Sequence, residues 1–380
     1  MYPDSFSQNS DGLMHTILPA EHWTRMILPG MARVLRTYTE YGLINHTTGG
    51  FTKWLERKEA LPLGVVGLFY QHSSKLLAYL LDRPFPVVNV SSADPPPGLP
   101  GVFVDNRAVG RMAADHLLKL EGRTFAFLNV GPGRLSQLRF EGYRERIEEV
   151  LPGTEVIRLG GLVPEFTPKL RELPKPAALF CATDNRARAA ANVAAELGLK
   201  IPEDLAILGV DNDPYECETT RVPLSSVSVP FEKIGEKAME TLLRMLQGIE
   251  PASWVTEIAP THVEARLSSD PLVFEDEMVN RAVRRLRQSG PTPLNVEGLA
   301  HELGLSRRSL ELRFRKTGAG TVHALIHRIR MDRAAELLRD SRLTLAEVSK
   351  QTGIQNYSRF GQLFRERFGM SPGEFRKRRL

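Results

Sequence analysis

Short runs of apolar residues alternate with amphipathic segments over roughly the first 270 residues of the chain. The runs are rich in valine, leucine and phenylalanine, and apolar and polar positions do not alternate within them. Uninterrupted runs of this kind are typical of strands that are buried on both faces of a parallel sheet. We therefore predict strands at residues 63–69, 86–90, 125–130, 177–182 and 205–210.

The segments between these runs have the apolar spacing of helices, at residues 107–120, 136–150, 185–197 and 231–246. Alternation of strands and helices predicts a doubly wound α/β architecture. About 260 residues are enough for two such lobes. The sequence therefore predicts a two-lobed α/β domain over residues 12–270, preceded by a loose tail at residues 1–11.

The pattern changes near residue 270, where the apolar runs end and every later segment has helical periodicity. Pro271 and the pair Ser268 and Ser269 suit a boundary, so we predict a linker at residues 268–274. The sequence then predicts an all-α domain at residues 271–380.

The helical region repeats itself once, at residues 294–318 and 343–369. Each copy has a small residue where two helices would cross and a glycine where the turn between them needs a left-handed backbone. Each also has two large apolar residues four positions apart, which point the second helix inward. The corresponding positions are Ala300, Gly304, Leu310 and Phe314 in the first copy and Ser349, Gly353, Phe360 and Phe364 in the second. Ser306 is a candidate cap for the second helix of the first copy.

The outer face of that second helix carries residue types that read base edges in the major groove of DNA. The candidates are Arg307, Arg308 and Glu311 in the first copy and Ser358, Arg359 and Gln362 in the second. Residues 321–339 would join the copies as one helix about 30 Å long, setting the reading helices roughly one DNA turn apart. The repeat thus predicts two helix-turn-helix units; an all-helical protein-interaction domain is the other interpretation.

Charge is divided unevenly along the chain, which carries +5 overall. Residues 275–380 contain 22 Lys and Arg against 12 Asp and Glu, whereas the remainder contains 28 against 33. A basic module joined to a mildly acidic one is typical of a nucleic-acid binder attached to a domain with another task. A solvated basic face would give the same charge.

Composition and motifs exclude several other classes. No run of 18 apolar residues is present, so no membrane partner is expected, and the polar start does not resemble a secretory signal. Cys181 and Cys217 are the only cysteines, too few for a disulfide framework or a four-thiolate zinc site. Phosphate-loop, zinc-protease and nucleophile-elbow motifs are missing. We therefore expect a cytoplasmic protein that is not an enzyme and uses no cofactor or metal.

Polar residues follow three of the predicted strands. In an open α/β sheet, ligands bind beyond the carboxyl ends of the strands. Amides and carboxylates there can bind hydroxyl groups, and an arginine can supply the opposing donor, which suits a polyhydroxylated small molecule. The candidates are Asn89, Thr183, Asp184, Asp211, Asn212 and, on a neighbouring helix, Arg139. For Asn89 the alternative is that it only closes a turn.

The second helical copy, ending FRERFGMSPGEFRKR, resembles the AraC-type DNA-binding domain over about 85–100 residues. The resemblance implies double-stranded operator DNA as a partner. It places base-reading positions at Arg308, Glu311, Ser358 and Gln362. Leu312 departs from the family, which often has a polar reader there. The first unit is therefore expected to read fewer bases or to depend on Arg307 and phosphates.

The stretches FVDNRAVGRMAADHLL, GPGRLSQLRFEGYRER and LAILGVDN resemble the sensor domain of LacI/GalR-type repressors, which is periplasmic-binding-protein-like. This resemblance covers most of residues 85–247. It implies effector contacts from Asn89, Arg139, Thr183 and Asp211, with Asp184 and Asn212 beside them. It also implies contacts from the loop after the first strand, where His22 and Trp23 are the candidates.

A sensor followed by an AraC-type reader is the arrangement of the XylR-type family of xylose operon regulators. The resemblance implies a ligand-responsive activator of sugar catabolism that senses a sugar such as xylose in a cleft between two lobes. It also implies a homodimer that works with RNA polymerase. The alternative is a sugar-binding or sugar-modifying protein whose basic C-terminal module serves in assembly.

Overall fold

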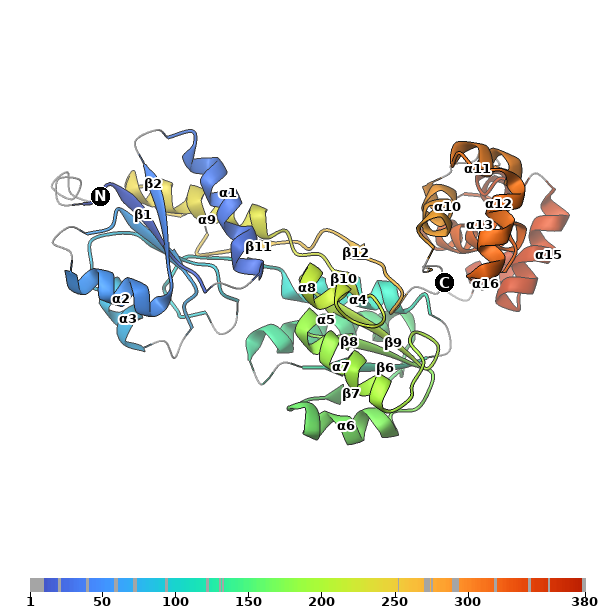
Figure 1. Cartoon of the computed structure of the whole chain (residues 1–380), viewed down its shortest axis with the longest axis horizontal. Helices are drawn as coiled ribbons and strands as arrows, with labels where there is room; N and C mark the ends of the chain where they lie inside the picture. The colour runs from blue at the N-terminus through green and yellow to red at the C-terminus, as the bar shows by residue number, and fades with distance from the viewer. Residues whose placement is uncertain are drawn as a thin grey trace. The chain divides into compact units, whose positions relative to one another are not determined.

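The computed structural model (Figure 1) divides into two compact units, Met1–Asp270 and Pro271–Leu380. It describes residues 10–19, 22–38, 41–57, 61–70, 74–92, 95–120, 123–129, 131, 133–251, 253–269, 274, 276–288, 294–317, 320–340, 343–354 and 356–377. Each unit is considered by itself.

The first unit contains two six-stranded sheets that share one plan. The first sheet has the order β2-β1-β3-β4-β5-β11, and all its strands are parallel. Its strands are β1 (Leu13–Ile17), β2 (Gly42–His46), β3 (Gly64–Gly67), β4 (Val87–Asn89), β5 (Gly101–Val104) and β11 (Val255–Ile258). Helices α1 (His22–Leu35) and α9 (Phe231–Leu246) pack on one face, and α2 (Thr48–Arg57) and α3 (Ser74–Leu81) pack on the other.

The second sheet has the corresponding order β7-β6-β8-β9-β10-β12 and is parallel except for β12. Its strands are β6 (Thr124–Leu128), β7 (Val156–Leu159), β8 (Ala177–Cys181), β9 (Leu205–Val210), β10 (Ser225–Val227) and β12 (Val263–Glu264). Helices α4 (Asn106–Leu117) and α5 (Arg134–Val150) cover one face, and α6 (Val163–Glu172) and α7 (Asp184–Glu196) cover the other; α8 is Pro214–Glu218. We call the two sheets with their helices the first and second lobes.

The chain passes between the two sheets three times, after β5, β10 and β11. The crossing segments hydrogen-bond to one another: Asp105 N donates to Ile258 O at 2.8 Å, and Ser228 N donates to His262 O at 2.8 Å. Figure 1 shows these segments running side by side between the lobes. The two-lobed α/β prediction is thereby confirmed, and all five predicted strands are present as β3, β4, β6, β8 and β9.

The predicted extents of the loose tail and of the linker are wrong in part. Residues 1–9 of the expected loose tail lie outside the described residues, but Ser10 pairs with Leu61, and Asp11 Oδ2 lies 3.0 Å from His15 Nε2. At the expected linker, Ser268 and Ser269 are buried in the first unit. Ser268 Oγ donates to Ile207 O of β9 at 2.6 Å, and Ser269 Oγ lies 2.7 Å from His116 Nε2 of α4, so both side chains belong to the second lobe.

Each lobe contains one pair of helices in very close contact, and glycines permit it. An added Cβ at Gly110 of α4 would lie 2.1 Å from Arg139 O, and one at Gly142 of α5 would lie 2.1 Å from Arg107 O. Gly30 of α1 and Gly235 of α9 form the same reciprocal arrangement in the first lobe. The backbones therefore touch where any side chain would hold them apart.

The second unit is helical, and one long helix, α13, takes part in two separate cores. The helices are α10 (Glu277–Gln288), α11 (Val296–Glu302), α12 (Arg307–Lys316), α13 (Val322–Asp340), α14 (Leu345–Gln351), α15 (Tyr357–Phe368) and α16 (Pro372–Lys377). Helix α13, predicted at 321–339, is about 28 Å long. Its first half packs into a core with α10–α12, and its second half packs into a core with α14–α16. Among the described residues, no helix of the chain is long and apolar enough to cross a membrane.

Candidate ligand site and nucleic-acid interface

Arg139 of α5 is a buried arginine at the carboxyl edge of the second sheet, with 2% of its side chain exposed. Its Nε donates to Asn106 Oδ1 at 2.8 Å, and its Nη1 donates to Ala182 O. Its Nη2 lies 3.9 Å from Asp211 Oδ1. Burial lowers the pKa of Arg139, and the carboxylates of Asp211 and Asp184 oppose that shift. The guanidinium is thus held in place by two bonds and directed toward one carboxylate.

Asp211 and Asn212 follow β9 in an uncommon backbone conformation, with φ of 109° and 53°. Such values cost non-glycine residues about 1–3 kcal/mol each, so the surroundings must hold them. Asp211 N donates to Val227 O at 3.0 Å, and Asn212 N donates to Ser226 Oγ at 2.9 Å. Arg266 Nη2 donates to Asn212 Oδ1 at 2.8 Å. Strain held in this way is typical of ligand clamps, and it turns the loop at the strand's carboxyl end.

Asp184 lies beneath this loop and is 1% exposed. Its Oδ2 accepts a hydrogen bond from Asp213 N at 2.8 Å, and its Oδ1 accepts one from the Ser226 hydroxyl at 2.6 Å. Burial raises the pKa of Asp184 well above its usual value, and the nearby Asp211 charge adds to the rise. Because the carboxylate is occupied and buried, it holds the loop in position. An added Cβ at Gly209 would lie 2.1 Å from Asp184 Oδ1, so glycine there leaves room for it.

Thr183 caps α7, since its hydroxyl accepts from Arg186 N at 3.4 Å. Arg186 in turn donates from Nε to Asn129 O at 3.1 Å and from Nη2 to Gly161 O at 2.7 Å. It therefore ties α7 to the loops after β6 and β7. The side-chain Oδ1 of Asn129 is buried and has no hydrogen-bond partner among the described residues.

Asn89 lies at the end of β4, and its amide is fully engaged by the backbone. Its Oδ1 accepts from Phe69 N at 2.9 Å and Ser91 N at 3.0 Å, and its Nδ2 donates to Phe69 O and Ser91 O. In this structure Asn89 closes a turn, which is the alternative considered from the sequence. Trp23, near the start of α1, packs against Phe231 with ring centroids 6.0 Å apart. His22 begins α1, and its side chain lies outside the described part.

The predicted cluster is therefore divided between the lobes. Arg139, Thr183, Asp184, Asp211 and Asn212 come together at one edge of the second sheet, whereas Asn89, His22 and Trp23 belong to the first lobe. Sequence reasoning missed Asn129, Ser226 and Arg266. Only Asn129 gives a signal in the sequence, as the one polar residue within the apolar run at residues 125–130.

The two helix-turn-helix units have the local features that their spacing predicts. Gly304 and Gly353 adopt φ of +68° and +73°, and Ser306 caps α12 by accepting from Ser309 N at 3.1 Å. The four large apolar residues of the second helices, Leu310, Phe314, Phe360 and Phe364, are fully buried. Ala300 and Ser349 are buried where the helices cross. These predictions are confirmed.

The proposed DNA-reading residues lie on the outer faces of α12 and α15. Arg307, Arg308, Ser358, Arg359 and Gln362 are exposed and Glu311 is half-buried. In the first helix-turn-helix unit, Arg307 pairs with Glu311 and Glu297. In the second, Arg359 Nη1 donates to Gln362 Oε1 at 2.8 Å.

The buried residues set the register between the two reading helices. With Leu310 matched to Phe360, Leu312 corresponds to Gln362, and 48% of the Leu312 side chain is exposed. A helix turns by about 100° per residue, so Arg315 and Arg365 lie on the same outer stripes. Both are exposed, as is Tyr357 at the start of α15. These three were missed, although helical periodicity alone could have found them.

Comparison with known proteins assigns each unit separately. Residues 114–269 match the family model of the periplasmic binding protein-like domain, and residues 299–378 match that of a helix-turn-helix domain. The chain is 27% identical over 312 residues to the xylose operon regulatory protein of Escherichia coli K12, covering 78% of this chain and 80% of that protein. It is 28% identical over 295 residues to the protein of that name from Haemophilus influenzae, covering 75% and 76%.

A solved structure described as the xylose-binding transcription activator xylR has the same fold over almost the whole chain. The TM-score is 0.57 at 23% identity, covering 96% of this chain and 97% of that one. Fold and site thus define a DNA-binding transcription regulator in which a periplasmic-binding-protein-like sensor precedes a double helix-turn-helix unit. Within that class, the two matched domains and the similarity to the xylose operon regulatory proteins support a regulator of the XylR type. Its relatives are regulators rather than enzymes, and the assembly-module alternative is not favoured.

Proposed function

We propose that this regulator senses a polyhydroxylated small molecule, a pentose such as xylose, and binds its operator according to whether that sugar is present. The observation that carries the proposal is Arg139 directed at Asp211 from 3.9 Å, with Asp211 and Asn212 held in strained conformations beside it. A carboxylate and a guanidinium fixed at a sheet's carboxyl edge can accept from and donate to vicinal hydroxyl groups. The names of the relatives support a xylose-class effector.

In this proposal Asp211 and Arg139 contact the sugar, and Thr183 lies beside them. Asp184 and Asn212 act through the loop that they hold, because their polar atoms are engaged by Asp213, Ser226 and Arg266. His22 and Trp23 are proposed as contacts from the first lobe. Asn89 has a lesser claim, since all four of its side-chain hydrogen bonds go to the backbone.

The proposal extends to the way the regulator works on DNA. Arg308, Glu311, Ser358 and Gln362 would read bases, and Arg307 and Arg359 would assist them or contact phosphates. We propose that the chain acts in the cytoplasm as a homodimer and activates transcription together with RNA polymerase. Sugar binding would favour a conformation that makes contacts with the sugar which the other conformation cannot make. That conformation would present both reading units to the operator.

Asp211→Ala is expected to weaken sugar binding by about 2 kcal/mol, since the variant loses a carboxylate that accepts from hydroxyl groups in a largely buried site. DNA affinity without sugar should stay within about twofold of the parent's, because the change lies in the other unit. Isothermal titration with xylose and fluorescence anisotropy with duplex DNA measure the two quantities. Asp82→Ala, at an exposed aspartate after α3, is the matched control. Unchanged sugar affinity in Asp211→Ala would remove this residue from the site.

Gln362→Ala is expected to relax base preference at one operator position, at a cost of about 1–3 kcal/mol for the preferred base. The parent should also bind DNA with a strong dependence on salt, because basic side chains displace counterions from the phosphates. Selection of duplexes from a random pool, followed by anisotropy at several salt concentrations, measures both effects. Arg171→Ala, at an exposed arginine of α6, should change neither. A parent affinity that does not respond to salt would refute DNA binding itself.

A further inference from the structure

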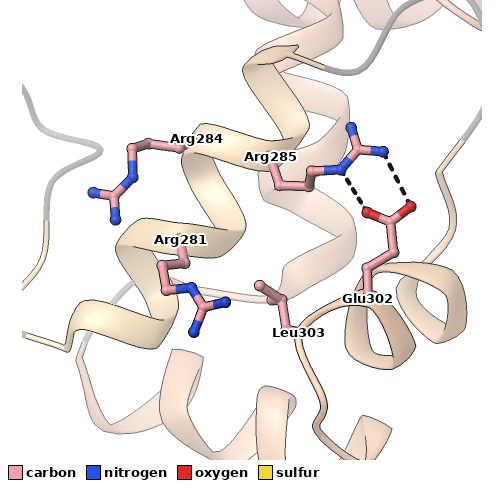
Figure 2. Close-up of a pocket in the computed structure, with 5 residues that line it drawn as sticks. All are labelled: Arg281, Arg284, Arg285, Glu302 and Leu303. Carbon is pink, nitrogen blue, oxygen red and sulfur yellow. Dashed lines mark hydrogen bonds and ion pairs between the residues drawn. The ribbon is translucent and has the colours of Figure 1, made fainter.

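A cavity of about 620 Å³ lies between α10 and the end of α11, and neither reading helix lines it. Three arginines of α10 line it together with Glu302 of α11 and Leu303, the residue directly after that helix (Figure 2). The arginines are Arg281, Arg284 and Arg285. We call Arg281, Arg284 and Leu303, with the cavity they border, the arginine surface.

The sequence of α10 places these arginines together on its outer side. Positions three and four residues apart are neighbours on a helix surface, so Arg281 lies next to both Arg284 and Arg285. The opposite side of α10 carries four buried apolar residues, Val279, Ala282, Val283 and Leu286. Because the apolar side is fixed in the core, the arginine side must face outward.

The three arginines differ in how their charges are matched. Arg285 binds both oxygens of Glu302, with Nη2–Oε1 at 3.0 Å and Nε–Oε2 at 2.5 Å, and so holds α10 against α11. Arg284 pairs with Glu277 across an exposed part of α10. Arg281 Nη1 contacts Met278 Sδ at 3.4 Å, and no carboxylate of the described residues lies within ion-pair distance of Arg281. The surface thus keeps excess positive charge beside one half-buried leucine.

Helix α12 shows on which side of the DNA-reading face α10 lies. Arg313 of α12 binds Asp276, directly before α10, with Nη1–Oδ2 at 2.7 Å. At about 100° per residue, Arg313 is roughly 160° around α12 from Glu311 and from Arg315. The beginning of α10 therefore lies behind α12 relative to its reading face.

The ion pairs of helix α11 independently indicate the same position of α10 relative to the reading face. Glu297 near its start pairs with Arg307, which belongs to the reading face. Glu302 comes five residues later, about 140° around the helix, and pairs with Arg285 of α10. One side of α11 thus faces the reading helix, and the far side faces the arginine surface.

From this geometry we propose that the arginine surface binds an acidic segment of a protein partner, with carboxylates at Arg281 and Arg284 and an apolar side chain beside Leu303. The proposal rests on the proposed DNA-reading face, since DNA bound there leaves the arginine surface open. A protein segment fits better than DNA because the beginning of α10 lies behind α12 relative to the reading face, and because a peptide can place a whole apolar side chain against Leu303. The partner would be a protein bound next to the regulator on the same DNA.

The test uses the full chain and a fluorescein-labelled peptide, Glu-Asp-Leu-Glu-Glu, followed by anisotropy. The double variant Arg281→Ala/Arg284→Ala is expected to bind the peptide at least about tenfold more weakly than the parent. The double variant Lys169→Ala/Arg171→Ala removes the same charge from exposed positions of α6 and should bind like the parent. Arg285 is left unchanged because it joins α10 to α11. The unfolding midpoints of both double variants should match that of the parent.

A second arm adds a duplex selected by the parent chain. Saturation with this duplex should leave peptide binding unchanged, and the Arg281→Ala/Arg284→Ala variant should keep the parent's slope of affinity against salt. Two results together would show that these arginines contact phosphates and would overturn the proposal. The duplex and the peptide would compete for the parent, and the slope of DNA affinity against salt would be smaller by about one or two in the Arg281→Ala/Arg284→Ala variant. Absent peptide binding, or equal binding by both double variants, would also overturn it. If the parent chain selected no duplex, the proposed DNA reading would be refuted instead. The peptide measurement would still stand, because it is made without DNA.

Discussion

Gly142→Ala is expected to destabilise the first unit by about 3 kcal/mol, the upper part of the usual range for overpacking. The new Cβ would lie 2.1 Å from the backbone oxygen of Arg107, and no side-chain rotation can relieve a clash with backbone. Helices α4 and α5 would have to separate, although their contact also brings Asn106 to Arg139. Urea unfolding followed by tryptophan fluorescence measures the effect on this unit, because Trp23, Trp54 and Trp254 all belong to it.

Gly49→Ala is the matched control for this change. An added Cβ at Gly49 of α2 meets nothing within 4 Å, and alanine is the better helix former. Its unfolding midpoint should therefore equal or slightly exceed the parent's. If Gly142→Ala unfolded at the parent's urea concentration, the close approach of α4 and α5 would be wrong.

The five strands that lie within long apolar runs could be predicted from the sequence, whereas β1, which contains buried polar residues, could not. Strand β1 includes His15 and Thr16, both fully buried. His15 Nε2 lies 3.0 Å from Asp11 Oδ2, and the Thr16 hydroxyl donates to Asn45 Oδ1 at 2.7 Å. The partner of Thr16 is 29 residues away, so its burial depends on pairing that no local pattern shows.

The helix-turn-helix units could be predicted in more detail because their determinants are local. Gly304 and Ser306 act through the backbone of their own turn, and Leu310 and Phe314 act through helical spacing. The arginine surface could not be predicted, since it depends on how α10 packs against α11. In the same way, the sequence marks Asp184 as polar after a strand but does not show that Ser226 and Asp213 engage it.

Arg139→Ala is expected to reduce both stability and sugar sensing. Removing the guanidinium leaves Asn106 Oδ1 and Ala182 O without their buried donors, and it withdraws the positive charge nearest Asp211. Losing one partner of a buried ion pair typically costs about 3–5 kcal/mol. We expect a loss at the lower end of that range, because the Nη2–Oδ1 separation of 3.9 Å is long and Asp211 is 21% exposed.

Two measurements separate the roles of Arg139. Urea unfolding reports stability, and a thermal-shift titration with xylose and other pentoses and hexoses reports sensing. In the parent, a sugar at a hundred times its dissociation constant should add about 2.7 kcal/mol, and in Arg139→Ala this response should disappear. Arg139→Lys should recover part of the stability through its charge but little of the sensing, because a lysine lacks the fixed fork that binds Asn106 and Ala182 while facing Asp211. Arg144→Ala, at an exposed arginine of the same helix, should match the parent in both measurements. If Arg139→Ala kept the parent's sugar response, the site would have to lie away from Asp211, and the strained loop after β9 would need another explanation.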